Sequence, residues 1–300
     1  MSSNAHRDFR LVRRDDCWVV IYTAMAGNCE VHLVCSEKSE AESLASLALV
    51  ETRRIERKYS RYRDDNIVHT INNAVGKPVG VDPETAGLLR FADQCYELSE
   101  GLFDITSGVL RRAWTFDGRE VDVNHTLIEE LRDIVGWDKV SWAGESLTLL
   151  PGMEIDFGGI GKEYAVDRVA QLLCAESSRS IMVNFGGDIR VTNPHTETRV
   201  WTIGIEDPLM ENAPIGQIEL RHGSVATSGD ARRYCWHEGK RLGHILNPLT
   251  GWPVAEAPRS VTVVADQCLE AGFLSTLAML HGAEAESFLK AQDVTYHCIR

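Results

Sequence analysis

Four glycine-rich polar loops constrain this chain more than any other feature of its sequence. They are Phe157-Gly158-Gly159-Ile160-Gly161-Lys162, Phe185-Gly186-Gly187-Asp188, Thr227-Ser228-Gly229-Asp230 and His244-Ile245-Leu246-Asn247-Pro248-Leu249-Thr250-Gly251. Glycine lets backbone N–H groups approach a phosphate closely, and a helix that follows the loop adds the positive end of its dipole. Taken alone, each loop is more typical of an ordinary turn, because Gly, Asp and Asn are common turn residues. Neither the dinucleotide fingerprint nor a Walker sequence is present.

Composition narrows the class of protein. The 300 residues are 44% hydrophobic, so the chain can bury a substantial core, and its net charge of -13 argues against a general nucleic-acid binder. An anionic small ligand would need a local basic pocket. The eight cysteines form no CxxC pair and no zinc-site spacing, which favours reduced thiols. The start of the chain has no signal-peptide pattern and no later stretch can span a bilayer, so we expect a cytoplasmic protein without a transmembrane segment.

The order of predicted elements indicates an α+β fold. Helical patterns cover 38–58, a helix that starts at Asp82-Pro83 and ends near Gly101, 126–135, 162–175, 269–281 and 283–291. Strand-like runs cover 17–23 and 29–35, which read as a hairpin, and 180–184, 200–206, 215–220 and 260–264. Without a regular βαβ rhythm, this mixture predicts largely antiparallel or mixed sheets with flanking helices. No repeat or linker appears, so we expect one domain over residues 15–300 after a disordered segment of residues 1–14.

Four residues, two in these loops and two elsewhere, have side chains suited to binding or catalysis. Lys162 brings a positive charge to the start of a predicted helix, where a phosphate would bind. His244 can exchange a proton near neutral pH, although a structural histidine bonded to the turn backbone fits equally well. Asp104 lies between apolar neighbours, where it can bond the backbone or a ligand hydroxyl. Tyr62 can stack on a planar ring, with ordinary aromatic packing as the default. No Gly-x-Ser-x-Gly elbow supports a serine hydrolase.

Seven short stretches share an order along the chain with a known family. They are Ala24-Met25-Ala26, Ser60-Arg61-Tyr62 followed by Asn72, Gly101-Leu102-Phe103-Asp104-Ile105-Thr106, Asp156-Phe157-Gly158-Gly159-Ile160-Gly161-Lys162, Val183-Asn184-Phe185-Gly186-Gly187-Asp188, Ala226-Thr227-Ser228-Gly229-Asp230 and the stretch from His244 to Gly251. Taken together, they resemble the FAD:protein FMN transferase family, also called the ApbE type. The resemblance covers about residues 20 to 290.

The resemblance implies an ApbE-like fold with a flavin cleft between two intimate subdomains. Members use Mg²⁺ and FAD to attach FMN through a phosphoester bond to a Thr or Ser of a client flavoprotein, and they release AMP. His244 looks like the base that deprotonates the acceptor hydroxyl. The resemblance places Lys162 and the loop with Gly158 and Gly159 beside the pyrophosphate of FAD. It implies that the flavin cleft is lined by Thr227, Ser228 and Asp230. The residues similar to those that hold the flavin or adenine are Met25, Tyr62 and Asp104. The implied metal ligands are the Gly161 carbonyl and the Thr276 hydroxyl.

Two departures from the family pattern concern the metal. The family motif Ala-Asp-x-x-x-Thr appears as Ala271-Gly272-Phe273-Leu274-Ser275-Thr276, so the carboxylate position holds glycine. Losing that carboxylate should weaken Mg²⁺ binding, because this hard ion favours carboxylate and phosphate oxygens. Glu163 stands where the family usually has Gly. It is one of three candidates for a replacement, with Glu270 and Asp266, and it fits equally a helix-start acid favoured by the dipole.

Three functions are compatible with this pattern. The first is FMN transfer with a rebuilt metal site. The second is a protein that binds or carries FAD without chemistry, which the loss of the carboxylate at Gly272 motivates. The third is FAD hydrolysis to FMN and AMP, with water as the nucleophile. We rank transfer first, because the loops that surround the expected site match the transferase pattern.

Overall fold

The computed structural model describes residues 8–197, 199–210 and 213–300, and these divide into two compact units. Unit 1 comprises Met1–Arg57, Ile160–Thr227 and Thr262–Gly272, and unit 2 comprises Lys58–Gly159, Ser228–Val261 and Phe273–Arg300. Helices occur with antiparallel sheets, as the predicted α+β class requires. The prediction of a single domain over residues 15–300 stays a prediction. The unit boundary falls within helices α1 and α6 and strands β11 and β14.

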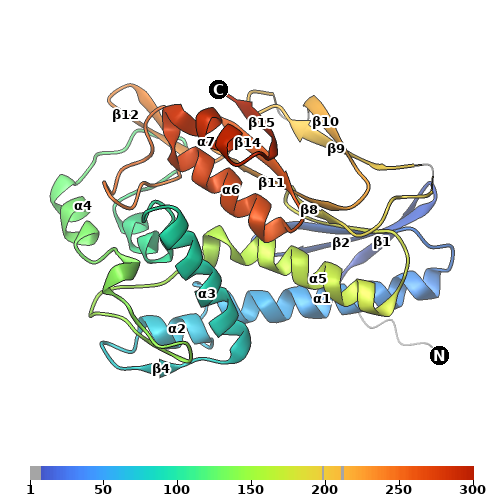
Figure 1. The fold of residues 1–300 in the computed structure, drawn as a ribbon, viewed down its shortest axis with the longest axis horizontal. Helices are drawn as coiled ribbons and strands as arrows, with labels where there is room; N and C mark the ends of the chain where they lie inside the picture. The colour runs from blue at the N-terminus through green and yellow to red at the C-terminus, as the bar shows by residue number, and fades with distance from the viewer. Residues whose placement is uncertain (1–7, 198, 211–212) are drawn as a thin grey trace. The chain divides into compact units, whose positions relative to one another are not determined.

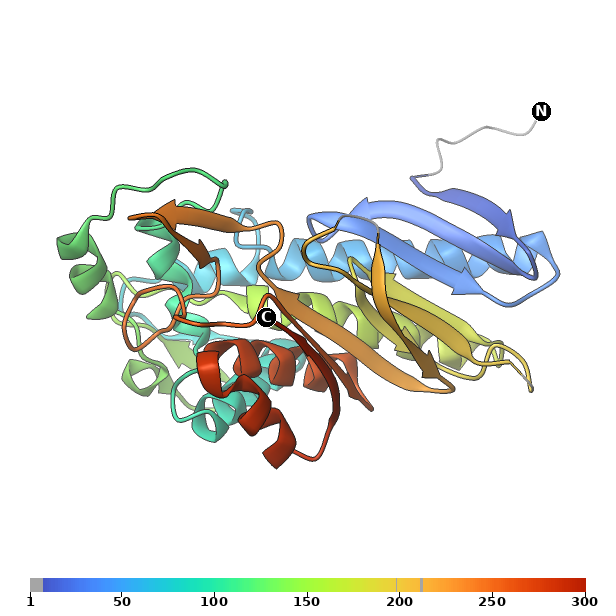
Figure 2. The same cartoon turned by 90° about the horizontal axis from the view of Figure 1, so that it is seen from above.

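An antiparallel sheet dominates unit 1. The strands of the sheet that lie wholly or partly in unit 1 are β1 (Arg10–Arg14), β2 (Cys17–Ala24), β3 (Gly27–Leu33), β7 (Ile181–Phe185), β8 (Asp188–Val191), β11 (Gly223–Gly229) and β14 (Ser260–Ala265), hydrogen-bonded in that order. The pairs from β1 to β11 are all antiparallel. Figure 2 shows the blue strands β1 to β3 beside the yellow strands β7 and β8. Buried side chains alternate along β3 and β7, which is the period-two pattern of a strand with one face in the core.

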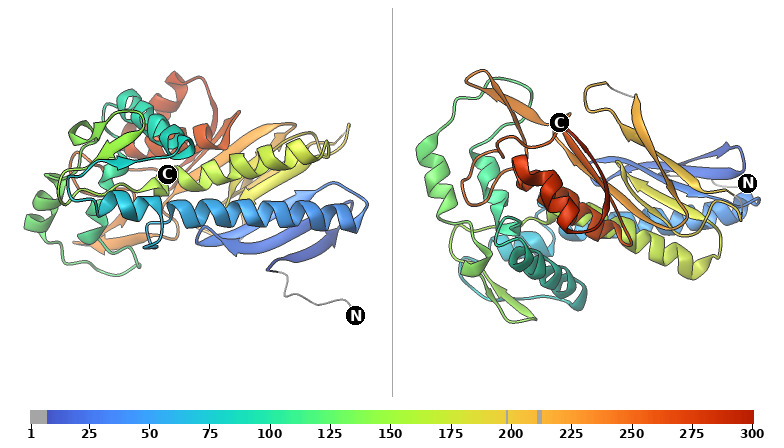
Figure 3. Two further views of the ribbon diagram at one scale, coloured as in Figure 1. Left: turned by 90° about the horizontal axis from the view of Figure 1, so that it is seen from below. Right: turned by 45° about the horizontal axis from the view of Figure 1, so that its top comes forward.

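Two helices cover a face of this sheet. Helix α1 (Lys38–Tyr59) and helix α5 (Gly161–Glu176) lie side by side across the strands (Figures 1 and 3). The buried residues of α1 repeat about every turn of the helix: Ala41, Leu44, Ala45, Ala48, Leu49, Thr52, Ile55 and Tyr59. Burying a leucine side chain in this way stabilises the fold by about 2 kcal/mol. This packing fixes the start of α5, and therefore Lys162, relative to the strands of unit 1.

A second ribbon completes unit 1. Strands β9 (Trp201–Glu206) and β10 (Pro214–Leu220) pair with each other antiparallel. Their inward side chains form one cluster with those of β8 and β11: Ile189, Val191, Trp201, Ile203, Leu220 and Val225. The ribbon therefore packs on the sheet rather than extending its edge.

Unit 2 is mainly helical. Its elements are α2 (Ile67–Asn72), β4 (Val79–Gly80), α3 (Pro83–Leu98), the 3₁₀ segments η1 (Ile105–Arg112), η2 (Trp137–Lys139), η3 (Phe157–Gly159) and η4 (Gly282–Glu284), α4 (His125–Arg132), β5 (Ser141–Trp142), β6 (Ser146–Thr148), β12 (Tyr234–His237), β13 (Lys240–Gly243), α7 (Ala285–Ala291) and β15 (Thr295–Ile299). Helix α6 (Cys268–Leu280) begins in unit 1 and ends in unit 2. Strands β4, β6 and β5 form a small sheet, and β12 pairs with β13. Two clusters around Val109 and Trp114 make the core of the loops near His244.

The predicted helix boundaries agree closely with the structure. Helix α3 begins after Asp82, whose carboxylate accepts from the N–H groups of Glu84 and Thr85. At its end, Ser99 is the cap and Glu100 takes the left-handed conformation with φ +51°. The Gly101 N–H donates to the Tyr96 carbonyl at 2.9 Å, so Gly101 closes the end of the helix one position later than a simple glycine cap.

The N-terminal expectation needs a correction. Arg10–Arg14 form strand β1, which pairs with β2, so the prediction of disorder over residues 1–14 is wrong for these residues. Three of the five residues of β1 are arginines, so the sequence had no strong strand pattern here. Residues 1–7 lie outside the described part of the chain. Among the described helices, none is both apolar and long enough for a membrane crossing.

Candidate active site

Lys162 forms the electrostatic centre of the loop that opens helix α5. Its Nζ lies 2.8 Å from Oδ2 of Asp188 on strand β8. Burial by itself lowers the pKa of Lys162, but the carboxylates of Asp188 and Glu163 outweigh it, and the net pKa is raised. Lys162 is therefore a full positive charge near neutral pH. The residue before α5, Ile160, provides no side-chain cap for the helix N–H groups. This combination suits a phosphate.

Asp188 is the site residue that sequence reasoning missed. It is 2% exposed, and its Oδ1 accepts from the Thr227 backbone N–H at 3.3 Å. The signal was present in the sequence, because an acid follows Gly186-Gly187, both of which have positive φ. Nothing local in that pattern indicates that the acid pairs with Lys162, which is 26 positions away in the sequence.

Glu163 lies beside this ion pair and is also buried, at 9% exposed. Its Oε2 atom has no hydrogen-bond partner among the described residues. Burial first, and then the Asp188 carboxylate, raise the pKa of Glu163 well above its ordinary value, against the lowering effect of Lys162. Two carboxylates thus share a single lysine. The cluster of Lys162, Glu163 and Asp188, which we call the acidic cluster, carries an excess of negative charge when its carboxyl groups are ionised.

The expected metal ligands lie in different surroundings. Gly161 is buried at the first position of α5, two residues before Glu163. The Thr276 hydroxyl lies 2.9 Å from the Ser228 hydroxyl, which is also 2.8 Å from Ser275. The described residues contain no group of three or more His, Cys, Asp and Glu side chains arranged for a metal. The unpartnered oxygen of Glu163 nevertheless fits a hard cation that is completed by hydroxyl, carbonyl and substrate phosphate oxygens, the usual way in which Mg²⁺ is bound.

Met25 and Thr227 are the other expected site residues of unit 1. Met25 lies in the β2–β3 turn with φ +53°, and Ala26 follows with φ +60°. The Met25 N–H donates to Glu56 Oε1 at 2.6 Å, which supports this uncommon conformation. The exposed Thr227 has its Oγ1 2.9 Å from that of Thr262.

His244 follows strand β13 in unit 2 and is half-buried. Its Nδ1 is buried and has no hydrogen-bond partner among the described residues, and its ring lies edge-on to Phe116. Burial and the charge of Arg233 lower the pKa of His244 to about 4, and a hydrogen bond to the Arg233 backbone opposes them. The imidazole is therefore neutral near pH 7 and able to accept a proton.

Asp230 of unit 2 has a different role from an unpaired acid. It is 8% exposed, and it forms ion pairs with Arg241 and, at 3.6 Å, with the Nε of Arg259. A Cβ on Gly243 would lie 2.9 Å from the Asp230 Cβ, so the carboxylate is packed tightly under β13. Two guanidinium groups balance one carboxylate here.

The Asp104 carboxylate accepts hydrogen bonds from the protein backbone. Its Oδ1 accepts from the N–H and the hydroxyl of Thr106, both at 2.7 Å, and its Oδ2 accepts from the Trp137 N–H at 3.0 Å. These three bonds favour the backbone-bonding alternative over contact with a ligand. Burial raises the pKa of Asp104, and the Thr106 bonds oppose that shift.

Tyr62 and Gly158 are exposed in unit 2, and Gly159 is partly buried. Tyr62 is 79% exposed, so it lacks the ordinary packing that was the default, and its ring is covered on one side by the Arg61 guanidinium at 4.8 Å. Arg61 also pairs with Asp156, whose Oδ1 accepts from the Gly158 N–H at 2.9 Å. A Cβ on Gly159 would lie 3.3 Å from the Phe103 ring.

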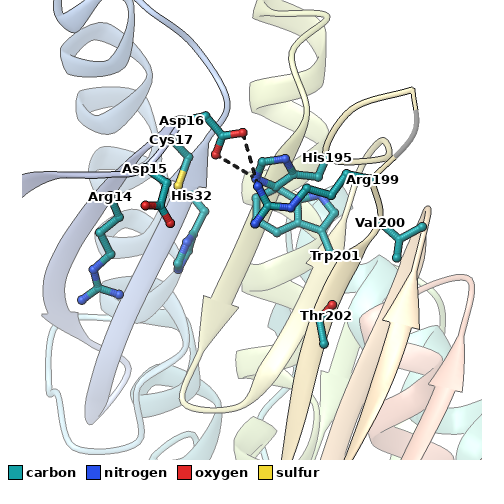
Figure 4. Close-up of a pocket in the computed structure, with 10 residues that line it drawn as sticks. All are labelled: Arg14, Asp15, Asp16, Cys17, His32, His195, Arg199, Val200, Trp201 and Thr202. Carbon is teal, nitrogen blue, oxygen red and sulfur yellow. Dashed lines mark ion pairs between the residues drawn. The ribbon is translucent and has the colours of Figure 1, made fainter.

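Two hollows of unit 1 are lined by none of these expected residues. The first, of about 230 Å³, contains an Asp16 carboxylate paired with His195 at 3.4 Å and with Arg199 at 3.5 Å (Figure 4). The second, of about 540 Å³, is lined by Asp266 with Arg190 and Gln171 among others. The hollows therefore do not mark the acidic cluster.

Comparison with known proteins identifies the family. The model of the ApbE family matches residues 25–299. The FAD:protein FMN transferase of Vibrio cholerae is 34% identical over 233 residues, which cover 75% of this chain and 69% of that protein. The enzyme of the same name from Haemophilus influenzae is 32% identical over 253 residues, covering 80% and 72%. The crystal structure of the ApbE protein of Thermotoga maritima superposes with a TM-score of 0.85 at 30% identity, covering 94% of both chains. This chain is therefore a member of the ApbE family.

Proposed function

We propose that this protein is an Mg²⁺-dependent FAD:protein FMN transferase. It binds FAD, moves the FMN half onto a Thr or Ser hydroxyl of a client flavoprotein, and releases AMP. The names of its relatives support this reaction. The observation that carries the proposal is His244, a half-buried imidazole whose pKa of about 4 keeps it neutral and whose buried Nδ1 has no partner among the described residues.

His244 acts as the general base. It takes the proton of the acceptor hydroxyl while that oxygen attacks the phosphorus of the FMN half. The bond from this phosphorus to the bridging oxygen breaks, and AMP leaves with that oxygen. Lys162, held charged by Asp188, stabilises the negative charge of the pyrophosphate. When bound, Mg²⁺ neutralises further charge on the pyrophosphate and the leaving group.

The remaining predicted contacts belong to substrate binding. We assign Gly158 and Gly159 to the approach of the pyrophosphate, and Tyr62 to stacking on a planar ring of FAD, because its ring is open to solvent. Thr227 and Ser228 supply hydroxyl groups for the flavin. Met25, Asp104 and Asp230 shape these surroundings through the backbone and ion-pair contacts already described. Six of the eight cysteines are buried free thiols, which supports a reducing compartment, and we propose the cytoplasm.

The test is incubation of the full chain with FAD, Mg²⁺ and candidate client proteins, followed by mass spectrometry of the client. We expect an added FMN on a Thr or Ser, together with one AMP for each client modified. AMP released at the same rate without any client would instead show FAD hydrolysis. FAD bound tightly, with no AMP over a range of Mg²⁺ concentrations, would show a carrier protein.

A further inference from the structure

The family pattern has Gly at position 163 and Asp at position 272, whereas this chain has Glu163 and Gly272, and these two residues meet in the structure. A Cβ placed on Gly272 would lie 2.5 Å from the Cγ of Glu163, 3.1 Å from its Cδ and 3.2 Å from its Oε1. Real Cβ atoms do not approach other atoms so closely. Glu163 therefore fills the space in which a side chain at position 272 would begin.

Two hydrogen bonds between helix α5 and the start of α6 hold this contact in place. Asp167 lies four residues after Glu163, so the two acids share one face of α5. The Asp167 carboxylate accepts from the N–H groups of Cys268 and Leu269 at 3.0 and 2.9 Å, which caps the start of α6. Gly272 lies four residues after Cys268 on α6. The Asp167 cap thus fixes the register that places Glu163 against Gly272.

The surroundings of Glu163 leave one of its carboxylate oxygens open to a further cation. Glu163 and Asp188 are both buried, and Lys162 is the positive charge that they share. The Oε2 of Glu163 has no hydrogen-bond partner in the described part of the chain. A buried carboxylate oxygen without a partner is costly unless an ion or donor satisfies it. A helix-start acid that serves only the dipole would remain at the solvated surface, so that alternative does not explain the burial.

The other candidate carboxylates lie elsewhere. Glu270 is exposed, and its position two residues before Gly272 puts it on the far side of α6. Asp266 is exposed as well and lines the separate hollow with Gln171 and Arg190. Glu163 is the one of the three candidates that is buried against Gly272.

We propose that Glu163 supplies the carboxylate ligand of the divalent cation, in place of the side chain absent at Gly272. The inference rests on the proposed function for the identity of the cation as Mg²⁺. The Gly161 carbonyl, at the first position of α5, is a second ligand from unit 1. Substrate phosphate oxygens supply the rest, as is usual for this ion.

The test measures cation binding directly, with Mn²⁺ as the probe and electron paramagnetic resonance as the readout. The full-length protein is titrated with and without FAD and without a client. We expect Glu163→Gln to raise the Kd for Mn²⁺ by about tenfold or more while FAD binding without metal stays the same. Glu270→Gln, on the same helix as Gly272, is the matched control and should leave the Kd unchanged.

Moving the carboxylate from position 163 to position 272 gives a second test. The double substitution Glu163→Gly with Gly272→Asp should bind Mn²⁺ within about threefold of the starting protein, whereas Glu163→Gly alone should not. Gly272→Asp alone should have a lower Tm than the double variant, because its Cβ meets Glu163. Unchanged Mn²⁺ binding in Glu163→Gln, or no recovery in the double variant, would overturn the proposal.

The transfer assay separates this inference from the proposed function. If Glu163→Gln loses Mn²⁺ and the starting protein transfers no FMN to any client, the ligand assignment stands and the proposed function fails. If FMN is transferred but the Mn²⁺ affinity does not depend on Glu163, the proposed function stands and the ligand assignment fails.

Discussion

Asp188 in unit 1 and Asp230 in unit 2 share a sequence context but not an electrostatic environment. Each directly follows a glycine, and they are 2% and 8% exposed. Asp188 shares Lys162 with a second buried carboxylate. Asp230 alone faces two guanidinium groups, those of Arg241 and Arg259. The first neighbourhood has an excess of negative charge when both of its carboxyl groups are ionised, and the second has an excess of positive charge.

This difference separates a structural acid from one available for binding. A carboxylate that pairs with two cationic side chains is already neutralised, and it stabilises the fold. Where carboxylates outnumber cations, some negative charge is left for a ligand ion. His244 extends the contrast within unit 2, because its Nδ1 is buried without a partner among the described residues. We therefore expect His244 and the acidic cluster to affect the reaction, and Asp230, whose charge is balanced by two guanidinium groups, to affect stability.

The largest expected effect is at His244. His244→Ala should lower the rate of FMN transfer by about 10²- to 10⁴-fold, because the general base is lost. The affinity for FAD should change by less than about threefold, since a base contributes mainly to the chemical step. Rates are measured by mass spectrometry of the client and affinity by flavin fluorescence.

Two controls accompany this variant. Exposed His222→Ala should transfer FMN at the normal rate. Added imidazole should restore part of the activity of His244→Ala, which a purely structural histidine would not allow. Normal transfer by His244→Ala would remove His244 from the mechanism and break the link between missing partners and chemistry.

The next effect compares the two aspartates directly. Asp230→Asn should reduce the free energy of unfolding by about 3 kcal/mol, because it leaves two largely buried guanidinium groups without their counter-charge. Asp188→Asn should change it by less than about 1 kcal/mol, since the lost pair with Lys162 is offset by relief of repulsion with Glu163. Urea unfolding measures both. Equal losses in the two variants would mean that charge balance does not distinguish the sites.

A smaller effect is expected at Asp104, the acid bonded to Thr106 and Trp137. Asp104→Asn should reduce the free energy of unfolding by about 2 kcal/mol, because the amide of Asn would face the Trp137 N–H donor. FAD affinity should stay within about threefold, as for a structural acid. A large loss of FAD affinity at unchanged stability would instead favour contact between Asp104 and a ligand hydroxyl.

Local patterns in the sequence predicted most of the helices and the longer strands. The hairpin expected at 17–23 and 29–35 forms β2 and β3, and the helix expected at 38–58 forms α1. Both depend on periodicity and turn residues, which are local properties. Strand β1 was missed because its five residues include three arginines, and pairing with β2 overrides that weak strand pattern.

Local sequence patterns could not predict the charge balance at the site. Lys162 was predicted from its place after the glycine loop, and the exchange of Glu163 and Gly272 was visible against the family pattern. The sequence left three candidate carboxylates open, because the choice depends on how α6 packs against α5. The Asp167 cap on the N-terminus of α6 decides that packing, and it joins residues about a hundred positions apart. The same reason hid the pairing of Asp188 with Lys162.

The smallest expected effect concerns the pH dependence of kcat/KM. Because the pKa of His244 is lowered to about 4, the imidazole stays neutral as the pH falls through 6.5, and the rate should fall only as the pH approaches 4. Arg233→Gln removes a positive charge that lowers this pKa but keeps the backbone bond. The acid limb of the profile should therefore move to higher pH, by a fraction of a unit, since burial is the larger cause of the shift. The neighbouring Arg232→Gln is the control and should not move it, and circular dichroism at each pH confirms that the protein is folded. The titrating base would be another group if the acid limb of the unchanged protein lay near pH 6.5, or if it did not move in Arg233→Gln. In either case the unpartnered Nδ1 of His244 would have no part in the reaction.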